Sequence, residues 1–328
     1  MTVLDGSSPA VIDEAARLLA AGELVGFPTE TVYGLGARAD DDAAVAKIFA
    51  AKGRPQSHPL IVHVASPAEA GRFARSWPVH AQRLAARFWP GPLTVIVPRV
   101  AGLAAAAAGG QDSIGLRCPS HPVARALLAA AAGAGVPGVA APSANRFGRI
   151  SPTTAAHVVA EFGPALAVLD GGACDVGIES AIVDCTRAEP VLLRPGQLGR
   201  EALAAALGCT LRDRDADAPR ATGTLDAHYA PRARLRLMDA GQLRAALQVL
   251  PKPALNSVAV YSRTVPRPQS TTRASRAMPD DPVAAAHELF AALRELDASG
   301  AELIWVETPP DAPAWDGVRD RLQRAAAA

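Results

Sequence analysis

The chain has 328 residues, more than one hydrophobic core usually serves, so its length predicts two domains. Its 33 basic and 32 acidic side chains leave a formal net charge of +1, which excludes a globally basic nucleic-acid-binding protein and confines any basic footprint to a local patch. The four cysteines form no C-x-x-C pair, so neither a zinc site nor a disulfide framework is indicated, and no apolar run of membrane-spanning length is free of Gly or Pro; we therefore expect a cytoplasmic protein.

Polar residues crowd the end of the first buried strand. A helix is expected over 11–21, followed by the strand Val25–Phe27, which Pro28 ends. Three hydroxyls and a carboxylate follow within five positions: Thr29, Glu30, Thr31 and Tyr33. Alone, this segment would be interpreted as a hairpin whose polar side chains face water, and a ligand site is the alternative.

The next helix delivers two cations at its C-terminus. It begins at Asp40–Asp42, repeats apolar residues at helical spacing and ends at Gly53, so Lys52 and Arg54 lie where the helix dipole favours positive charge. Only three of the 33 basic residues are lysines, which makes a retained Lys52 informative. An ammonium acts as a point charge and a guanidinium forks onto planar oxyanions, so together they offer two kinds of anion contact.

Three further strands also end in polar residues. Leu60–Val64 ends near His63, the strand from Ile114 delivers Arg117, and 136–141 leads into Ser143 and Asn145. Ligands bind at strand ends in α/β domains, so this recurrence predicts one shared cleft. Alone, His63 would be a strand histidine with a satisfied nitrogen.

The remaining elements of the first domain are less informative. Ser66 to Glu69 forms a capping box before a short helix, Ala101–Gly110 is expected to be a mobile surface loop, and Ser151–Thr153 is expected to cap a helix to Phe162. Helices are also expected over 79–88 and 122–132, and strands over 93–97, 166–169, 181–185 and 191–193.

The second half begins after an irregular stretch. We expect a first domain over 1–207, a linker over 208–233 that contains Tyr229, and a second domain over 234–328. The second domain alternates strands with helices, the pattern of a small doubly wound α/β unit, and its helix over 283–298 has one apolar stripe. Neither domain contains a dinucleotide or P-loop glycine motif.

The predicted cleft combines several cations with hydroxyls. The cations are Lys52, Arg54, Arg117 and Arg194; the other polar groups are Thr31, His63, Ser143, Asn145 and Ser180. No Ser-His-Asp or Cys-His order emerges, so a covalent nucleophile is not expected. The set suits a nucleoside triphosphate with Mg²⁺ that keeps most of its waters, so no metal-ligating residues are predicted.

Nine motifs give the chain a family resemblance. They are F-P-T-E-T-V-Y-G-L-G from Phe27, K-G-R-P from Lys52, H-P-L-I-V-H from His58, W-P-G-P-L-T from Trp89, G-L-R from Gly115, A-P-S-A-N from Ala141, S-P-T from Ser151, L-R-P-G from Leu193 and H-Y-A-P from His228. In this order and spacing they resemble the L-threonylcarbamoyladenylate synthase family with its YrdC-like domain. The resemblance implies an α/β fold: a YrdC-like twisted mixed sheet with a concave cleft, plus a small Rossmann-like C-terminal domain.

The resemblance also implies a reaction and a set of site residues. L-threonine, bicarbonate or CO₂, and ATP with Mg²⁺ would give L-threonylcarbamoyladenylate and pyrophosphate, for the machinery that transfers threonylcarbamoyl to tRNA. Threonine would be held by Thr31, His63, Arg117, the backbone of Ala141, and Ser180. ATP would be held by Arg54, His58, Ser113, Ser143, Ser151, Arg194 and Tyr229. The catalytic set would be Lys52, Arg54, Ser143 and Asn145, and the H-Y-A-P segment would act as a lid.

Some residues depart from the family pattern, and two other functions stay open. His58 stands where the family often has asparagine, Ala181 where it has threonine, and Ala221-Thr222-Gly223 where it has S-P-G. An RNA chaperone could use the same basic concavity, although the near-zero charge and the lack of an aromatic platform count against it, and direct tRNA binding is left open. Carbamoyl transfer in metallocofactor maturation would need acylphosphatase and zinc-finger segments that this sequence does not contain.

Overall fold

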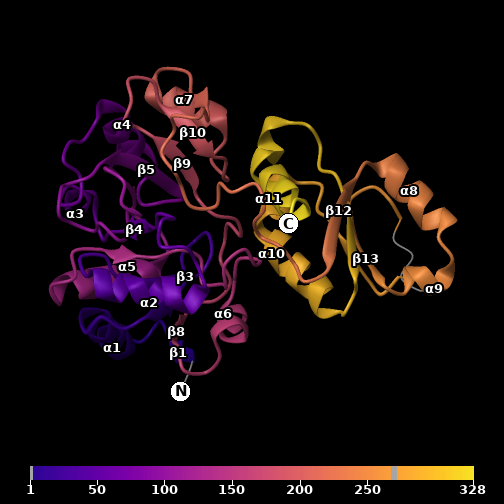
Figure 1. Cartoon of the computed structure of the whole chain (residues 1–328), viewed down its shortest axis with the longest axis horizontal. Helices are drawn as coiled ribbons and strands as arrows, with labels where there is room; N and C mark the ends of the chain where they lie inside the picture. Colours follow the sequence, from indigo (N-terminus) through magenta and orange to yellow (C-terminus); the bar gives the residue numbers. More distant parts are fainter. Residues whose placement is uncertain (1–2, 267–271) are drawn as a thin grey trace. The chain divides into compact units, whose positions relative to one another are not determined.

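The computed structural model describes residues 3–266 and 272–328, and the chain folds into two compact units (Figure 1). The first comprises Met1–Phe147 and Ser151–Thr224, and the second comprises Gly148–Ile150 and Leu225–Ala328. The segment 208–233, predicted as a linker, is therefore divided between the units at Thr224. Its first part forms the short strand β11 (Arg212–Asp213), which pairs with the sheet of the first unit.

The first unit is built on a mixed sheet of eleven strands, in the order β1-β8-β2-β3-β7-β4-β6-β5-β9-β10-β11. Besides β11, these strands are β1 (Val3–Asp5), β2 (Val25–Phe27), β3 (Gly34–Arg38), β4 (Ile61–His63), β5 (Leu93–Pro98), β6 (Ser113–Arg117), β7 (Val139–Ala140), β8 (Ala167–Asp170), β9 (Ala181–Asp184) and β10 (Val191–Arg194). Its helices are α1 (Pro9–Ala20), α2 (Asp42–Lys52), α3 (Pro67–Ala70), α4 (Val79–Phe88), α5 (Pro122–Gly133), α6 (Ala155–Phe162) and α7 (Arg200–Leu207). The mixture of parallel and antiparallel pairs matches the predicted fold class.

The two faces of the central strands have different partners because successive strand residues point in opposite directions. Val62, Val95 and Leu116 join the main hydrophobic core together with residues of α2, α4 and α7. Ile61 and Ile96 point to the other face, where they cluster with side chains of β9 and β10 and with Ala218 and Ala221 of the segment after β11. The segment 218–222 therefore packs against this second face of β4, β5, β9 and β10.

The start and end of α2 confirm the sequence prediction. Asp41 caps the helix by accepting hydrogen bonds from the Ala43 and Ala44 N–H groups, and Gly53 ends it at φ 65°, a left-handed conformation that glycine adopts without strain. Lys52 is consequently the last helical residue, and Arg54 follows the turn.

Three local predictions were wrong. Ser66 caps α3 by accepting from the Glu69 N–H, and Pro67 is its first residue, as predicted, but the Glu69 carboxylate accepts from the Ala65 N–H and so does not complete the capping box. The segment 101–110 is irregular as predicted, but it is not a surface loop, because Ala104, Ala107 and Ala108 are buried and the Ala107 carbonyl accepts from the Leu60 N–H. Thr154, not Ser151, caps α6.

The second unit contains a four-stranded parallel sheet in the order β12-β15-β13-β14. Its strands are β12 (Arg234–Met238), β13 (Val258–Ser262), β14 (Ala274–Ala277) and β15 (Leu303–Glu307); its helices are α8 (Ala240–Val249), α9 (Lys252–Leu255), α10 (Pro282–Ala298), the 3₁₀ turn η1 (Pro313–Trp315) and α11 (Asp316–Ala326). Helices on both faces confirm the doubly wound prediction, which had missed β14 and α9. The apolar stripe of α10 is buried except at Val283, which is half exposed.

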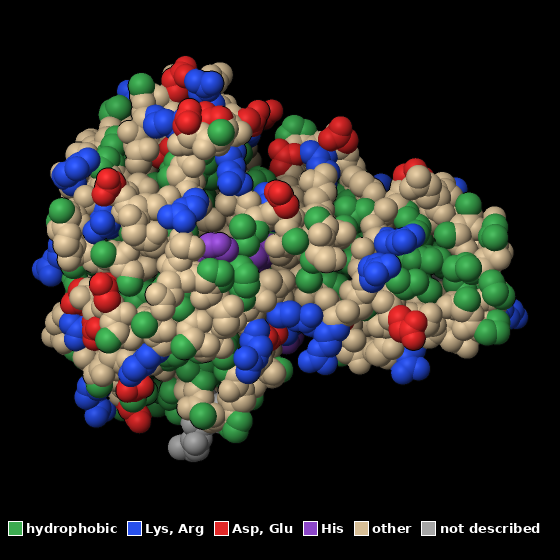
Figure 2. All heavy atoms as spheres, viewed as in Figure 1, with side chains coloured by type: hydrophobic (Ala, Val, Ile, Leu, Met, Phe, Trp, Pro, Cys, Tyr) green, Lys and Arg blue, Asp and Glu red, His purple; other side chains and the backbone are tan. Residues whose placement is uncertain are grey.

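The surface carries charges of both signs. Lys and Arg side chains are interspersed with Asp and Glu over the face in Figure 2, as the net charge of +1 leads one to expect. Among the described residues, no helix is long and apolar enough to cross a membrane.

Candidate active site

The sheet brings the predicted strand-end residues of the first unit together. β4 and β6 pair in parallel with His63 opposite Arg117, and β7 pairs with β4 on its other side. The segment after β2 joins them, since Glu30 contacts Arg117 and Gly34 forms a backbone bridge with Ser143. The residues that follow β2, β4, β6 and β7 therefore lie close together in the first unit, as the sequence predicted.

Lys52 joins two of the quoted motifs directly. Its side chain is buried, and Nζ donates to the Ser143 carbonyl at 2.6 Å and also to the Asn145 carbonyl. The Lys52 carbonyl in turn accepts from the Phe147 N–H at 2.9 Å. Burial lowers the pKa of Lys52 well below its usual range, and the positive charge of Arg54 lowers it further. In this conformation the ammonium fixes the 143–147 loop.

Arg54 and Arg194 both contact Thr222. Arg54 Nη2 donates to the Thr222 hydroxyl at 3.2 Å and to the Pro59 carbonyl at 2.9 Å. Arg194 Nη1 donates to the Thr222 carbonyl at 3.0 Å, and its Nε donates to the Ser180 carbonyl at the same distance. Both guanidinium groups are buried, so the segment after β11 is held by two cations that also suit an anionic ligand.

His63 and Arg117 carry buried polar atoms without protein partners. Among the residues that the structure describes, neither His63 Nδ1 nor Arg117 Nε makes a hydrogen bond. Burial lowers the pKa of His63 to about 3, and the charge of Arg117 acts in the same direction, so its imidazole is neutral at physiological pH. Buried polar atoms are normally paired, and two adjacent exceptions point to a ligand.

The other hydroxyls of the predicted site have protein partners. Thr31 shares a 2.8 Å hydrogen bond with Thr29, and Ser180 shares one of the same length with Thr94. Ser151 donates to the buried carboxylate of Glu179, which explains why it does not cap α6.

The remaining predicted residues lie around these groups. Ala141 donates its backbone N–H to the Ile61 carbonyl at 2.9 Å, and Ser113 lies half-buried at the start of β6. The rings of His58 and Phe147 lie 5.5 Å apart, and Arg54 lies over the same phenyl ring. Burial lowers the pKa of His58, and the charges of Arg54 and Arg220 lower it further.

A small hollow lies between the face of the sheet that carries Ile61 and Ile96 and the segment 220–222. Its apolar floor comes from β4, β5, β6 and β9, and Thr94, Gln111 and Ser113 add polar groups. Its lining residues are Pro59, Leu60, Ile61, Thr94, Ile96, Gln111, Ser113, Gly115, Ile182, Arg220, Ala221 and Thr222. Thr222, which lines this hollow, is also the residue that Arg54 and Arg194 contact.

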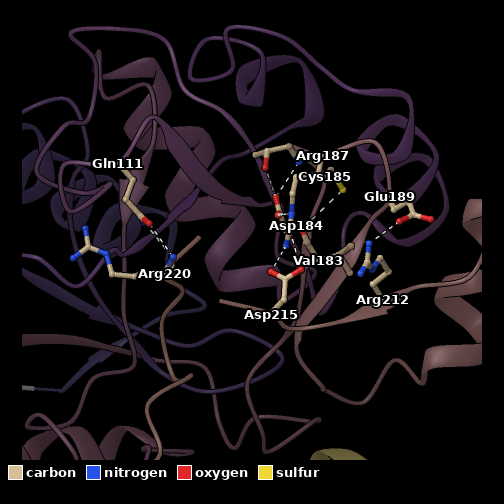
Figure 3. Close-up of polar contacts among 10 residues, drawn as sticks. Gln111, Val183, Asp184, Cys185, Arg187, Glu189, Arg212, Asp215 and Arg220 are labelled. Carbon is tan, nitrogen blue, oxygen red and sulfur yellow. Dashed lines mark hydrogen bonds and ion pairs between the residues drawn. The ribbon is translucent and has the colours of Figure 1, made fainter. Parts of the chain in front are cut away.

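Side-chain contacts fasten the segment 212–222 over this face (Figure 3). The Gln111 amide donates to the Arg220 carbonyl at 3.1 Å and accepts from the Arg220 N–H at 2.8 Å. Nearer the start of the segment, Arg187 forms a bidentate pair with Asp215, with both N–O distances at 3.0 Å, and Arg187 Nε also contacts Asp184. Together with the contacts of Thr222 and the pairing of β11 with β10, these interactions attach the segment at several points, one of them on the rim of the hollow.

Tyr229 belongs to the second unit. Its ring is buried and lies 5.4 Å from that of Phe290 and 4.2 Å from that of His228, and the Arg321 guanidinium lies 5.6 Å from its centroid. Its backbone has φ 63°, which is uncommon for a non-glycine residue. The ATP contact predicted for Tyr229 stays a prediction.

Sequence reasoning missed several residues of the site. Glu30 stands in the first quoted motif and Glu179 directly precedes Ser180, so position alone could have drawn attention to both. Thr94 ends the quoted motif W-P-G-P-L-T and Thr222 stands in the quoted Ala221-Thr222-Gly223, whereas Gln111 gave no such signal, because its irregular segment meets the others only in the folded sheet.

Comparisons with known proteins agree with this architecture. A family model described as telomere recombination matches residues 17–196, and one described as threonylcarbamoyl-AMP synthase, C-terminal domain, matches residues 198–327. The chain is 36% identical to the threonylcarbamoyl-AMP synthase of Pyrococcus abyssi, over 95% of this chain and 92% of the relative, and 36% identical to that of Bacillus subtilis, over 96% and 92%.

A solved structure extends the likeness to three dimensions. Pyrococcus abyssi Sua5 complexed with L-threonine matches with a TM-score of 0.88 and 35% identity, covering 97% of this chain and 95% of that one. Of the functions that the sequence left open, these findings support the synthase. With relatives of this kind over nearly its whole length, the chain belongs to the threonylcarbamoyl-AMP synthase family.

Proposed function

We propose that this enzyme makes L-threonylcarbamoyladenylate from L-threonine, bicarbonate or CO₂, and ATP, and that the cleft of the first unit is where the reaction occurs. The observation that carries the proposal is the adjacent pair of buried atoms, His63 Nδ1 and Arg117 Nε, that have no partner among the described residues. A threonine carboxylate would satisfy the Arg117 N–H, and the threonine hydroxyl would satisfy the imidazole nitrogen.

The first chemical step joins the threonine nitrogen to carbon. After the ammonium loses a proton to solvent, the amine attacks CO₂ and the adduct loses a second proton to solvent, or the amine attacks bicarbonate with loss of water; either route gives a carbamate. The protein's contribution is to hold the amine close to its partner, which converts an encounter between solutes into a reaction within one complex. Thr31, Ala141 and Ser180 would complete the threonine contacts.

The second step transfers the adenylyl group. A carbamate oxygen attacks the α-phosphorus of ATP, the bond from that phosphorus to the bridging oxygen breaks, and pyrophosphate leaves with the electron pair. Negative charge moves onto the leaving group, so Arg54 and Arg194 would act by fixed electrostatic attraction. Ser113, Ser143, Ser151 and His58 would position the nucleotide, and Lys52 with Asn145 would fix the loop that presents Ser143.

Magnesium is proposed to arrive with ATP. Such an ion would be held by the phosphate oxygens of the nucleotide and would keep most of its waters, so the proposal requires no dedicated metal ligands from the protein. Such an ion neutralises phosphate charge, while the residues named above bind and orient the substrates.

Pyrophosphate release tests the proposed function. Purified protein should release pyrophosphate only when ATP, L-threonine and bicarbonate are all present, and RNA should not be required. Equal release without threonine would refute the carbamate as the nucleophile. Salt-sensitive binding of RNA that is tighter than binding of ATP would instead favour an RNA chaperone.

A further inference from the structure

Glu30 is a buried carboxylate for which the steps above give no role. It follows β2, and only 5% of its surface is exposed. Oε1 accepts from Arg117 Nη2 at 2.7 Å, and Oε2 accepts from the Ser120 N–H at 3.0 Å. Both oxygens therefore hold groups at or just beyond the C-terminal end of β6.

This contact fixes the plane of the Arg117 guanidinium. A guanidinium is planar with five N–H donors, so anchoring one terminal nitrogen on a rigid carboxylate limits how the rest can turn. Glu30 takes Nη2, whereas the buried Nε has no partner among the described residues. The N–H of Arg117 Nε is thus left to donate to a substrate carboxylate, and Arg117 lies opposite His63 on the neighbouring strand.

Glu30 also sets the local charge. Burial alone would raise its pKa, but the charge and hydrogen bond of Arg117, together with backbone N–H groups that include that of Ser120, outweigh burial and hold the pKa below its usual value. With Glu30 ionised, Arg117 cationic and His63 neutral, the three groups together carry no net charge before substrate arrives. Removing one member of a buried pair leaves the other charge uncompensated, which is costly.

We infer that Glu30 is a positioning residue for amino-acid recognition: through its ion pair it orients Arg117 so that Nε meets the substrate carboxylate beside His63. The inference rests on the proposed threonine site and deepens it. Glu30 therefore determines the affinity for threonine and not the affinity for ATP, although it is proposed to touch neither substrate.

The Glu30→Gln variant tests this role. The amide has the same shape, but it has no charge, and it cannot accept from both Arg117 and Ser120 because one of its ends is a donor. The KM for threonine should rise by about tenfold or more, as expected for a lost hydrogen bond to a charged group, and the KM for ATP should not change. Glu23→Gln is the matched control, because Glu23 makes a 2.8 Å pair with Lys47 that lies on the surface, and both KM values should stay at the wild-type level.

A double-mutant cycle shows whether Glu30 acts through Arg117. Arg117→Lys should itself raise the KM for threonine, and Glu30→Gln should add little in that background, because the geometry it maintains is already lost. Effects that multiply would overturn the inference, as would an unchanged KM for threonine in Glu30→Gln or an equal rise in the KM for ATP.

Two further measurements keep the outcome clear. Thermal unfolding and ATP binding identify any variant that has lost its fold. If Glu30→Gln does not fold, Glu30→Asp takes its place. An unchanged affinity for threonine in Glu30→Asp, whose side chain is shorter, would then overturn the inference. Calorimetric titration with threonine gives affinity without turnover. If the wild-type protein binds threonine but releases no pyrophosphate, the proposed reaction is refuted. The role of Glu30 is then tested by the same double-mutant cycle, with threonine affinities in place of KM values.

Discussion

The ammonium of Lys52 lies 2.6 Å from the backbone carbonyl of Ser143, so the last residue of α2 holds the loop that carries Ser143 and Asn145. A lysine at a helix C-terminus can be a simple surface charge, but here the side chain is buried and its hydrogen bonds go to the backbone. The relationship makes Lys52 an organiser of the cleft as well as a charge within it.

Lys52→Met should therefore lower kcat much more than it raises the KM for threonine. A shift of about 1 Å in the Ser143 loop can cost on the order of a hundredfold in rate, because reacting groups must be aligned. Steady-state pyrophosphate release measures both constants. Lys47→Met, on the exposed face of the same helix, is the control and should behave like wild type. A Lys52→Met enzyme with near-normal turnover would show that Lys52 serves only as a helix-end charge.

His63→Ala should narrow the preference for threonine over 2-aminobutyrate, which lacks the hydroxyl. A site that hydrogen-bonds a hydroxyl rejects the analogue without it, since its own polar group is then left unpaired. The ratio of kcat/KM values for the two amino acids measures the preference. An unchanged ratio would make His63 a structural residue of β4.

Stability should depend on pH through His63. Its pKa is about 3 in the folded protein, below its ordinary value of about 6.5, so between these values the unfolded chain binds a proton that the folded chain does not. The contribution of His63 to the free energy of unfolding is therefore fully present above about pH 6.5. It falls as the pH is lowered, by roughly 1.5 kcal/mol between pH 6.5 and pH 5. Urea unfolding at several pH values measures the slope. His63→Gln should reduce this loss, and an identical slope in the variant would contradict the assignment.

Gln111→Ala should loosen the segment 212–222 at the rim of the hollow. It removes both hydrogen bonds between Gln111 and Arg220 and leaves the Arg187–Asp215 pair and the contacts of Thr222 intact, so the segment stays attached elsewhere. We expect a higher KM for ATP, an unchanged KM for threonine and faster proteolysis within 212–222. Gln82→Ala, which removes an exposed hydrogen bond to the Trp77 carbonyl outside this segment, is the control. Cleavage that ATP and threonine do not slow in wild type would count against a covering role for this segment.

The sequence predicted local features well where the local pattern determines the structure. Asp41 and Gly53 bound α2 as capping chemistry requires, and strand ends bring His63 next to Arg117. It failed where distant contacts decide. Ser151 stands in a sequence that is typical of a helix N-cap, yet its hydroxyl donates a hydrogen bond to Glu179, which is distant in the sequence. The alanines of 101–110 gave no sign that their small side chains would allow close packing under Leu60.

The linker shows the same limit. No periodicity in 208–233 indicates that residues 218–222 would cover one face of the sheet, or that Thr222 would lie between two arginines. Such a segment is defined by what it contacts, so its structure becomes visible only once the strands beneath it have been placed.

The contact of Arg54 and Arg194 with Thr222 has a consequence for selectivity among anions. Because the hydroxyl and carbonyl of one threonine accept from both guanidinium groups, a small anion such as inorganic phosphate must displace main-chain and side-chain hydrogen bonds before it can bind. It brings few contacts of its own to compensate, whereas a nucleotide adds those of its base and sugar. In the proposed ATP site, this arrangement would therefore disfavour simple phosphates relative to a nucleotide.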